Sequence, residues 1–152
     1  MKIIKTTQLT KHQLAQINQL WNDEYPIKLK DRFPILLDGI DRYNHYFIED
    51  KQQDIIAWAV DFEKEKQVRF SIIVSSNHKG KGLGSMLIKK LKEGNIEFYG
   101  WVIDHNDDLK NNGDQYLSPI SFYLKHGFEI LNDIRIDSEM IKAVLIKWVS
   151  IK

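Results

Sequence analysis

The segment 74–88 constrains the fold more than any other part of the chain. It starts at the end of an apolar, β-branched run, crosses the polar and glycine-rich stretch 75–82, and continues with leucines at i, i+4 and i+8 from Leu83. Gly94 provides a helix stop, and 96–103 is again typical of a strand. Strand, glycine loop, helix and strand form a βαβ unit, so we expect its two strands to be near-parallel neighbours.

The part of the chain before this unit predicts two helices and several strands. Thr10 and Gln13 form a capping box at the start of a helix over 11–24, which Pro26 ends. A shorter helix is expected over 33–40. Strand-like runs, the last three separated by short polar breaks typical of hairpins, lie at 2–5, 43–49, 55–62 and 67–74.

The part after the unit predicts one more helix and a closing hairpin. A polar loop over 104–116 is followed by Ser118 as a helix N-cap and Pro119 at the first helical position. This helix is expected to end at Gly127 after about two turns. The runs 128–136 and 142–149 then close the chain as a pair of strands.

Composition excludes several classes of protein. A length of 152 residues fits a single domain over 1–152. The absence of cysteine excludes a thiol nucleophile, a disulfide framework and a thiolate zinc site. A net charge of +1 argues against nucleic acid as a partner. The chain has no signal-peptide core and no apolar run of the ~20 residues that span a bilayer, so we expect no membrane partner and a cytoplasmic protein.

The glycine loop has the character of an anion site. Gly80, Gly82 and Gly84 allow the backbone to approach a ligand closely, and the first amides of a helix have no partner within the helix. Together with the helix dipole and the positive charges of Lys79 and Lys81, they suit a pyrophosphate. The alternative is a tight turn with a solvated lysine pair. Neither the Walker A motif nor the dinucleotide fingerprint G-x-G-x-x-G matches this loop.

Two blocks of the chain resemble the GNAT superfamily of N-acetyltransferases. The loop Lys79-x-x-Gly82-x-Gly84 resembles its acetyl-CoA signature Q/R-x-x-G-x-G/A, with lysine in place of glutamine or arginine. The segment 119–128 resembles its block A-I-x-F-Y-x-K-x-G-F, with Pro119 in place of a small residue and Tyr116 where asparagine is frequent. The order of elements is similar too. The resemblance implies an α/β (α+β) fold with a mixed, mainly antiparallel sheet, helices on both faces and strands that splay where the cofactor enters.

The resemblance also implies a site and a reaction. Tyr123 would give a proton or a hydrogen bond to the departing coenzyme A thiolate, although the same residue could be a packed helix aromatic. The backbone of 72–74 would pair with the pantetheine arm, and an amide there would polarise the thioester carbonyl. The cofactor-binding residues implied for acetyl-CoA are Ile72, Ile73, Val74, Lys79, Gly80, Lys81, Gly82, Leu83, Gly84 and Ser85.

Other roles stay open. The resemblance implies an acceptor that is a primary amine of a small molecule or of a protein, and relatives commonly form homodimers. The histidines, His78 in the glycine loop among them, show no metal-ligand spacing, so no metal is expected. A non-catalytic acyl-CoA-binding regulatory module and an interaction domain with a degenerate loop are the alternatives. Candidates for the general base, beside a water relay, are Glu49, Asp61, Glu63, Asp104 and His105. Candidates for the acceptor pocket, beside a plain charged connector, are Trp21, Tyr25, Asp31 and Arg32.

Overall fold

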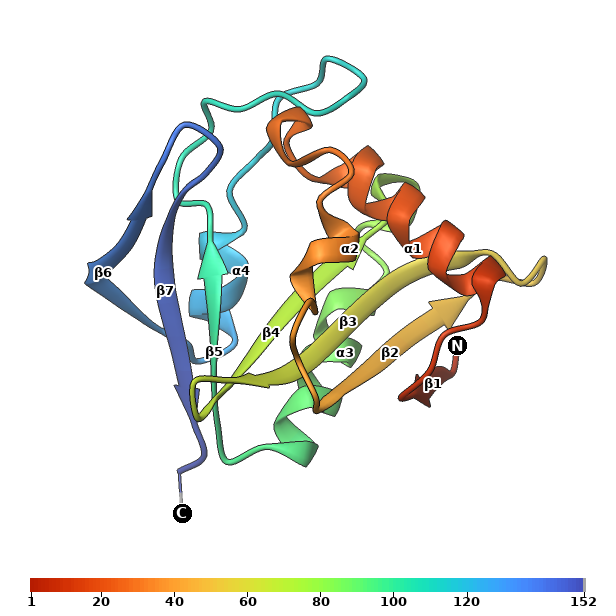
Figure 1. The fold of residues 1–152 in the computed structure, drawn as a ribbon, viewed down its shortest axis with the longest axis horizontal. Helices are drawn as coiled ribbons and strands as arrows, with labels where there is room; N and C mark the ends of the chain where they lie inside the picture. Colours follow the sequence, from red (N-terminus) through yellow and green to blue (C-terminus); the bar gives the residue numbers. More distant parts are fainter. Residues whose placement is uncertain (152) are drawn as a thin grey trace.

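A seven-stranded mixed sheet, in the order β1-β2-β3-β4-β5-β7-β6, organises the protein (Figure 1). The computed structural model describes residues 1–151. All neighbouring strands are antiparallel except β4 and β5, which are parallel as predicted. The strands are β1 (Ile3–Thr6), β2 (Tyr43–Glu49), β3 (Ile55–Lys64), β4 (Gln67–Val74), β5 (Glu97–Val102), β6 (Glu129–Asp137) and β7 (Lys142–Val149).

Helices cover both faces of this sheet, which confirms the predicted fold class. In the view of Figure 1, α1 and α2 lie in front of the strands, and α3 and α4 lie behind them. Alternating side chains of each strand feed two hydrophobic clusters, so Trp58 and Val60 pack on the α1 side while Ala57 and Ala59 pack on the α3 side. The α-helices are α1 (Lys11–Glu24), α2 (Phe33–Leu36), α3 (Leu83–Gly94) and α4 (Ile120–Lys125), and short 3-10 turns lie at η1 (Ile27–Leu29) and η2 (Ser76–His78).

Helix α1 begins and ends at the predicted residues because its end signals are local. Thr10 Oγ1 accepts the Gln13 N–H at 3.1 Å, and Gln13 Oε1 accepts the Thr10 N–H at 3.0 Å, which completes the capping box. Pro26 follows the C-cap residue Tyr25. No helix within residues 1–151 has the length and apolar character needed to cross a membrane.

Several other elements differ from their predicted limits, among them β5, which spans Glu97–Val102 and not 96–103. Helix α2 ends at Leu36 rather than at residue 40, because the chain turns at Gly39, which has a φ of 75°. Strand β3 continues to Lys64, two residues beyond the predicted end. Glu65 and Lys66 form the two-residue loop with φ values of 52° and 66°, and such a turn matches the twist of the flanking strands.

Helix α4 starts one residue later than predicted. Pro119 is its N-cap, and the first helical residue is Ile120. The Ser118 hydroxyl instead donates to the Ile103 carbonyl at the end of β5 and accepts the Ile120 N–H at 3.3 Å. The chain leaves the helix through Gly127, which has a φ of 85°.

Strands β4 and β5 separate soon after they meet. Among the described residues their ladder holds one registered pair, Arg69 with Tyr99. Beyond this pair, 72–74 keep their partners on β3 but have none on the β5 side. The peptide groups of this edge are therefore free to pair with a ligand.

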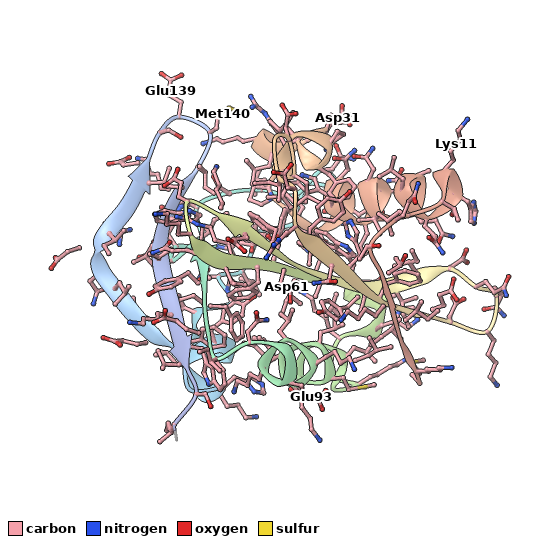
Figure 2. The ribbon with its side chains drawn as sticks, turned by 60° about the horizontal axis from the view of Figure 1, so that its bottom comes forward. Lys11, Asp31, Asp61, Glu93, Glu139 and Met140 are labelled. Carbon is pink, nitrogen blue, oxygen red and sulfur yellow. The ribbon has the colours of Figure 1, made fainter. Side chains whose placement is uncertain are left out.

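A buried carboxylate lies at the other end of the sheet. Asp61 is 5% exposed and accepts hydrogen bonds from Asn44 Nδ2 at 2.9 Å, Tyr46 Oη at 3.1 Å and Asn95 Nδ2 at 3.0 Å. It lies between the sheet and α3 (Figure 2). Three donors offset the cost of burying its charge, so the group joins β2, β3 and the end of α3.

His45 is buried beside this carboxylate in its neutral form. Its Nδ1 accepts the Trp58 Nε1–H at 3.0 Å, and the residue is 3% exposed. Burial lowers the pKa of His45 to about 4, although the nearby Asp61 charge raises it in part. The folded protein therefore resists protonation at this position.

We expect the free energy of unfolding to fall between pH 6.5 and pH 4. In this range the unfolded chain binds a proton at His45 and the folded chain does not. The contribution of His45 to the free energy of unfolding is therefore complete above the pKa of the unfolded chain. Up to ~3 kcal/mol of it is lost as the pH falls toward the pKa of the folded chain. His45→Gln keeps an acceptor for Trp58 but cannot titrate. Denaturant unfolding at pH 7 and pH 4.5 should show a smaller pH dependence for His45→Gln, and equal dependence in both proteins would contradict the assignment.

Candidate functional site

A cleft of about 500 Å³ opens where β4 and β5 part. Its walls are the end of β4, the loop into α3, the segment 116–119 and helix α4. All predicted cofactor-binding residues except Lys81 line it, and Tyr123 lines it too. Lys81 lies exposed on the same loop. The fold thus brings together residues that are about fifty positions apart in the chain.

The glycine loop adopts a backbone that other residues rarely take. Gly80 and Gly82 have φ values of 82° and 79°, and a Cβ at either position would meet nothing within 4 Å. Glycine is therefore required by conformation. At Gly84 the reason for glycine is lack of space, because a Cβ there would lie 3.1 Å from Cζ of Phe122, where α3 approaches α4.

The start of α3 offers free amides to the cleft. The first backbone hydrogen bond of the helix runs from Met86 N–H to the Gly82 carbonyl at 3.0 Å, so the amides of 83–85 have no helical partner. The first turn holds no acidic side chain, and the dipole favours an anion at this end. His78 also lines the cleft, and its Nδ1 is buried without a hydrogen-bond partner within residues 1–151. These groups fit a pyrophosphate.

Aromatic packing holds Tyr123 in the wall of the cleft. Its ring centroid lies 5.7 Å from that of Phe70, 5.2 Å from Phe122 and 5.3 Å from Phe128. Phe70 can occupy this position because Gly100 on β5 lacks a Cβ, which would lie 2.5 Å from the Phe70 ring. The ring of Tyr123 is therefore a packed core aromatic, while the residue also lines the cleft.

Three phenols share this cleft. Burial raises the pKa of Tyr25 to about 12, although a hydrogen bond with Ser71 lowers it in part. Burial raises the pKa of Tyr116 and Tyr123 further, and Tyr25 adds to both shifts. All three groups are neutral at physiological pH, so each can donate a hydrogen bond.

The residues suggested for the acceptor pocket are mostly placed elsewhere. Trp21 is buried, and its Nε1 donates to the Leu29 carbonyl at 2.8 Å. Asp31 is hydrogen-bonded to Asn22, and Arg32 contacts the sulfur of Met140 at 2.8 Å. Of these four candidates, Tyr25 alone lines the cleft.

The candidate bases do not line the cleft either. Asp61 is held by its three donors, and Glu49 and Glu63 are at strand ends away from it. Asp104 pairs with Arg135 at 2.9 Å. His105 lines a second cavity of about 640 Å³ between the loop after β5 and the β6–β7 turn.

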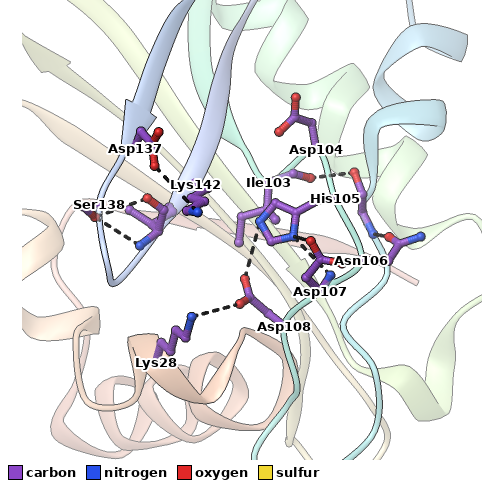
Figure 3. A network of polar contacts seen from close by, with 12 residues as sticks. Lys28, Ile103, Asp104, His105, Asn106, Asp107, Asp108, Asp137, Ser138 and Lys142 are labelled. Carbon is purple, nitrogen blue, oxygen red and sulfur yellow. Dashed lines mark hydrogen bonds and ion pairs between the residues drawn. The ribbon is translucent and has the colours of Figure 1, made fainter.

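The second cavity is lined by four carboxylates, two lysines and His105, some of them close to one another (Figure 3). Asp108 is 8% exposed and lies 3.6 Å from Lys28 Nζ and 3.8 Å from His105 Nε2. Lys142 Nζ lies 3.9 Å from Asp137 on the opposite side. Within residues 1–151, no three His, Cys, Asp or Glu side chains are grouped to hold a metal ion.

Sequence reasoning missed Glu24, the one carboxylate within residues 1–151 that lines the cleft. Glu24 is 8% exposed, although it stands in the last turn of α1. A carboxylate at a helix C-terminus opposes the helix dipole, and this local conflict was a signal that the residue serves another purpose. Tyr116 was visible only as a departure from a frequent asparagine.

Comparison with known proteins identifies the same fold. The family model described as "Acetyltransferase (GNAT) domain" matches residues 41–130. No curated protein matches the chain. Among solved structures, the chain is similar to an aminoglycoside 6'-N-acetyltransferase from Enterococcus faecium, with 13% identity, a TM-score of 0.71, and 100% of this chain and 98% of that one covered.

Two further solved structures are similar over nearly their whole length. A ribosomal-protein-alanine N-acetyltransferase from Brucella melitensis has 14% identity and a TM-score of 0.65, with 99% of this chain and 100% of that one covered. A variant of a spermidine N-acetyltransferase from Vibrio cholerae has 17% identity and a TM-score of 0.64, with 98% and 95% covered. At these identities the likeness concerns the fold.

We expect Gly82→Ala to lower the free energy of unfolding by ~1–2 kcal/mol, because a Cβ disfavours its positive φ without meeting any neighbour. Gly113→Ala, at a φ of 89° in the loop before α4, also has open space and should cost a similar amount. Chemical denaturation of both variants measures this cost. Unchanged stability of Gly82→Ala would contradict the left-handed conformation of the glycine loop.

Proposed function

Because the chain belongs to the GNAT acetyltransferase family, we propose that it transfers an acetyl group from acetyl-CoA to a primary amine. One observation carries the proposal. A free strand edge at 72–74 and a glycine loop at the start of a helix line the same cleft as the hydroxyl-bearing Tyr123. Such a cleft has an extended side for an arm with amide groups and an anion site for phosphates.

The proposed binding mode divides the cofactor between these two sides. The amides of 83–85 and the turn at Gly80 and Gly82 bind the pyrophosphate, and Lys79 adds positive charge. The peptide groups of 72–74 pair with the amides of the pantetheine arm, as an added strand would. His78 Nδ1 supplies a further polar contact.

Bound acetyl-CoA supplies a thioester whose acyl carbon accepts the nitrogen lone pair of the amine. A C–N bond forms, the C–S bond breaks, and one proton leaves the nitrogen while the sulfur gains one. Tyr123 donates its phenolic proton toward the sulfur, since its raised pKa keeps it protonated. An amide at 72–74 stabilises the negative charge that develops on the carbonyl oxygen.

The acceptor is proposed as a primary amine of a small molecule or of a protein. The names of similar structures mention aminoglycosides, spermidine and a protein alanine as substrates of those proteins. Tyr25 and Tyr116 border the cleft beside Tyr123, so their phenols are among the groups that an amine would meet there.

We expect Gly82→Glu to weaken acetyl-CoA binding at least ~10-fold, because a carboxylate then stands in the anion site and the residue must keep a positive φ. Isothermal titration of the purified protein with acetyl-CoA measures the dissociation constant, with NADH and ATP as controls for selectivity.

Gly39→Glu, between α2 and β2, is the matched control for this variant, because Gly39 also has a positive φ and open space for a Cβ. It adds the same charge at a positive φ outside the cleft, so its affinity should equal that of the wild type. Wild-type affinity in Gly82→Glu would refute the pyrophosphate assignment, and a wild type that does not bind acetyl-CoA would refute the proposed function.

We expect Tyr123→Phe to lower turnover by ~100-fold, the usual size of a general acid contribution, with unchanged affinity for acetyl-CoA. The ring contacts with Phe70 and Phe128 remain, so the fold should be intact. The assay detects free thiol with a panel of primary amines, and Tyr43→Phe on β2 is the control. Full turnover in Tyr123→Phe would remove this residue from the mechanism.

A further inference from the structure

Glu24 is a buried carboxylate in an unfavourable position. It is the last residue of α1, where the helix dipole opposes a negative charge, and it is 8% exposed. Burying such a charge is costly unless it is paired and hydrogen-bonded. Its partners therefore show what its burial achieves, and they lie in two segments that lead into different walls of the cleft.

The first partner is Ser76, on the wall formed by β4. Its N–H donates to Glu24 Oε2 at 2.9 Å, and its Oγ lies 2.7 Å from Oε2 and 3.0 Å from Oε1. Ser76 begins η2, two residues after β4 ends at Val74. Glu24 thus holds the chain at the point where the free strand edge turns into the glycine loop.

The second partner is Lys110, in the loop between β5 and α4, whose end at 116–119 forms a wall of the cleft. Its Nζ lies 3.2 Å from Glu24 Oε1, and its side chain is 12% exposed. Backbone contacts also attach this loop to the chain just after α1. Lys110 forms a β-bridge with Pro26, and the Ile27 N–H donates to the Leu109 carbonyl at 2.8 Å. The loop reaches across to the end of α1 in Figure 1.

Hydrogen bonds within the loop connect Lys110 to Tyr116, which lines the cleft. The Lys110 N–H donates to the Asp114 carbonyl, Leu109 bridges to Gln115, and the Tyr116 N–H donates to the Asp108 carbonyl at 2.9 Å. The loop is therefore a small hairpin with Lys110 at its turn. Tyr116 and the residues that follow it line the cleft opposite 72–74.

We propose that Glu24 is a positioning residue that joins the two walls of the cleft, by fixing Ser76 on one side and Lys110 on the other. Its two oxygens are occupied by these donors, so it acts by setting the distance between 72–74 and Tyr116. The effect on acetyl-CoA rests on the proposed function, whereas the mechanical link between the two walls does not.

Three single variants separate the two arms of this link. Glu24→Ala removes both, Lys110→Met removes the arm to the loop, and Ser76→Ala removes the hydroxyl arm to the strand exit while its N–H bond stays. Hydrogen exchange of backbone amides in 108–118 and in 74–78 reports each wall separately. Glu24→Gln keeps an acceptor for Ser76 but no charge for Lys110. The double variant Glu24→Gln/Ser76→Ala, which weakens both arms, replaces Glu24→Ala should that variant not fold.

For Glu24→Ala we expect hydrogen exchange about tenfold faster in both 74–78 and 108–118. Lys110→Met and Glu24→Gln should speed exchange in 108–118 alone. Ser76→Ala should speed exchange in 74–78 alone. The double variant Glu24→Gln/Lys110→Met should loosen the loop no more than either single variant, because all three break the same arm. Faster exchange in one wall only for Glu24→Ala, or additive effects in the double variant, would overturn the proposal.

Acetyl-CoA titration and pH profiles of turnover test whether the link also affects the proposed function. Glu24→Gln should weaken acetyl-CoA binding about tenfold and leave the shape of the kcat against pH profile unchanged, as expected of a residue that positions others. Loss of the acidic limb of that profile would make Glu24 a proton acceptor and overturn the positioning role. If wild-type protein does not bind acetyl-CoA, the proposed function fails, while the exchange pattern still decides the link.

Discussion

The separation of β4 from β5 is the constraint on which the rest of the structure depends. Backbone groups inside a sheet are normally paired, and leaving them unpaired is costly in a buried position. Here the ladder holds one pair, Arg69 with Tyr99, and the strands then diverge. The divergence leaves 72–74 free on one side and produces the cleft that the glycine loop closes at its end.

Aromatic packing occupies the place where the two strands meet before they part. Phe70 on β4 lies against Gly100 on β5 and contacts Phe98, Phe128 and Tyr123 through its ring. Protein interiors are closely packed, so a ring held on several sides has little freedom to move. The aromatic cluster therefore fixes the position of the Tyr123 hydroxyl. The same residues therefore stabilise the fold and define the site, which explains why Tyr123 can be both a core aromatic and a proposed proton donor.

A buried carboxylate connects several elements at each end of the sheet. At one end, Asp61 and its three donors join β2, β3 and α3 without reaching the cleft. At the other, Glu24 joins α1 to the exit of β4 and to the loop before α4. Both carboxylates are buried and satisfied, but they differ in what they connect. Asp61 connects elements of the scaffold, and Glu24 connects the walls of a site.

The sequence by itself determined the elements whose signals are local. The capping box of Thr10 and Gln13, the glycine loop before α3 and the βαβ unit depend on residues close together in the chain. Helices 11–24 and 83–94 and strands β2, β4 and β7 were therefore predicted with the limits that the structure has. The proposed cofactor segments and Tyr123 could be predicted because they carry motifs. Only the tertiary structure decided that Glu24, Tyr25 and Tyr116 share the cleft while Asp61 does not. Glu24 meets partners 52 and 86 positions away, and such contacts arise from the order of strands and the packing of helices, which no local pattern encodes.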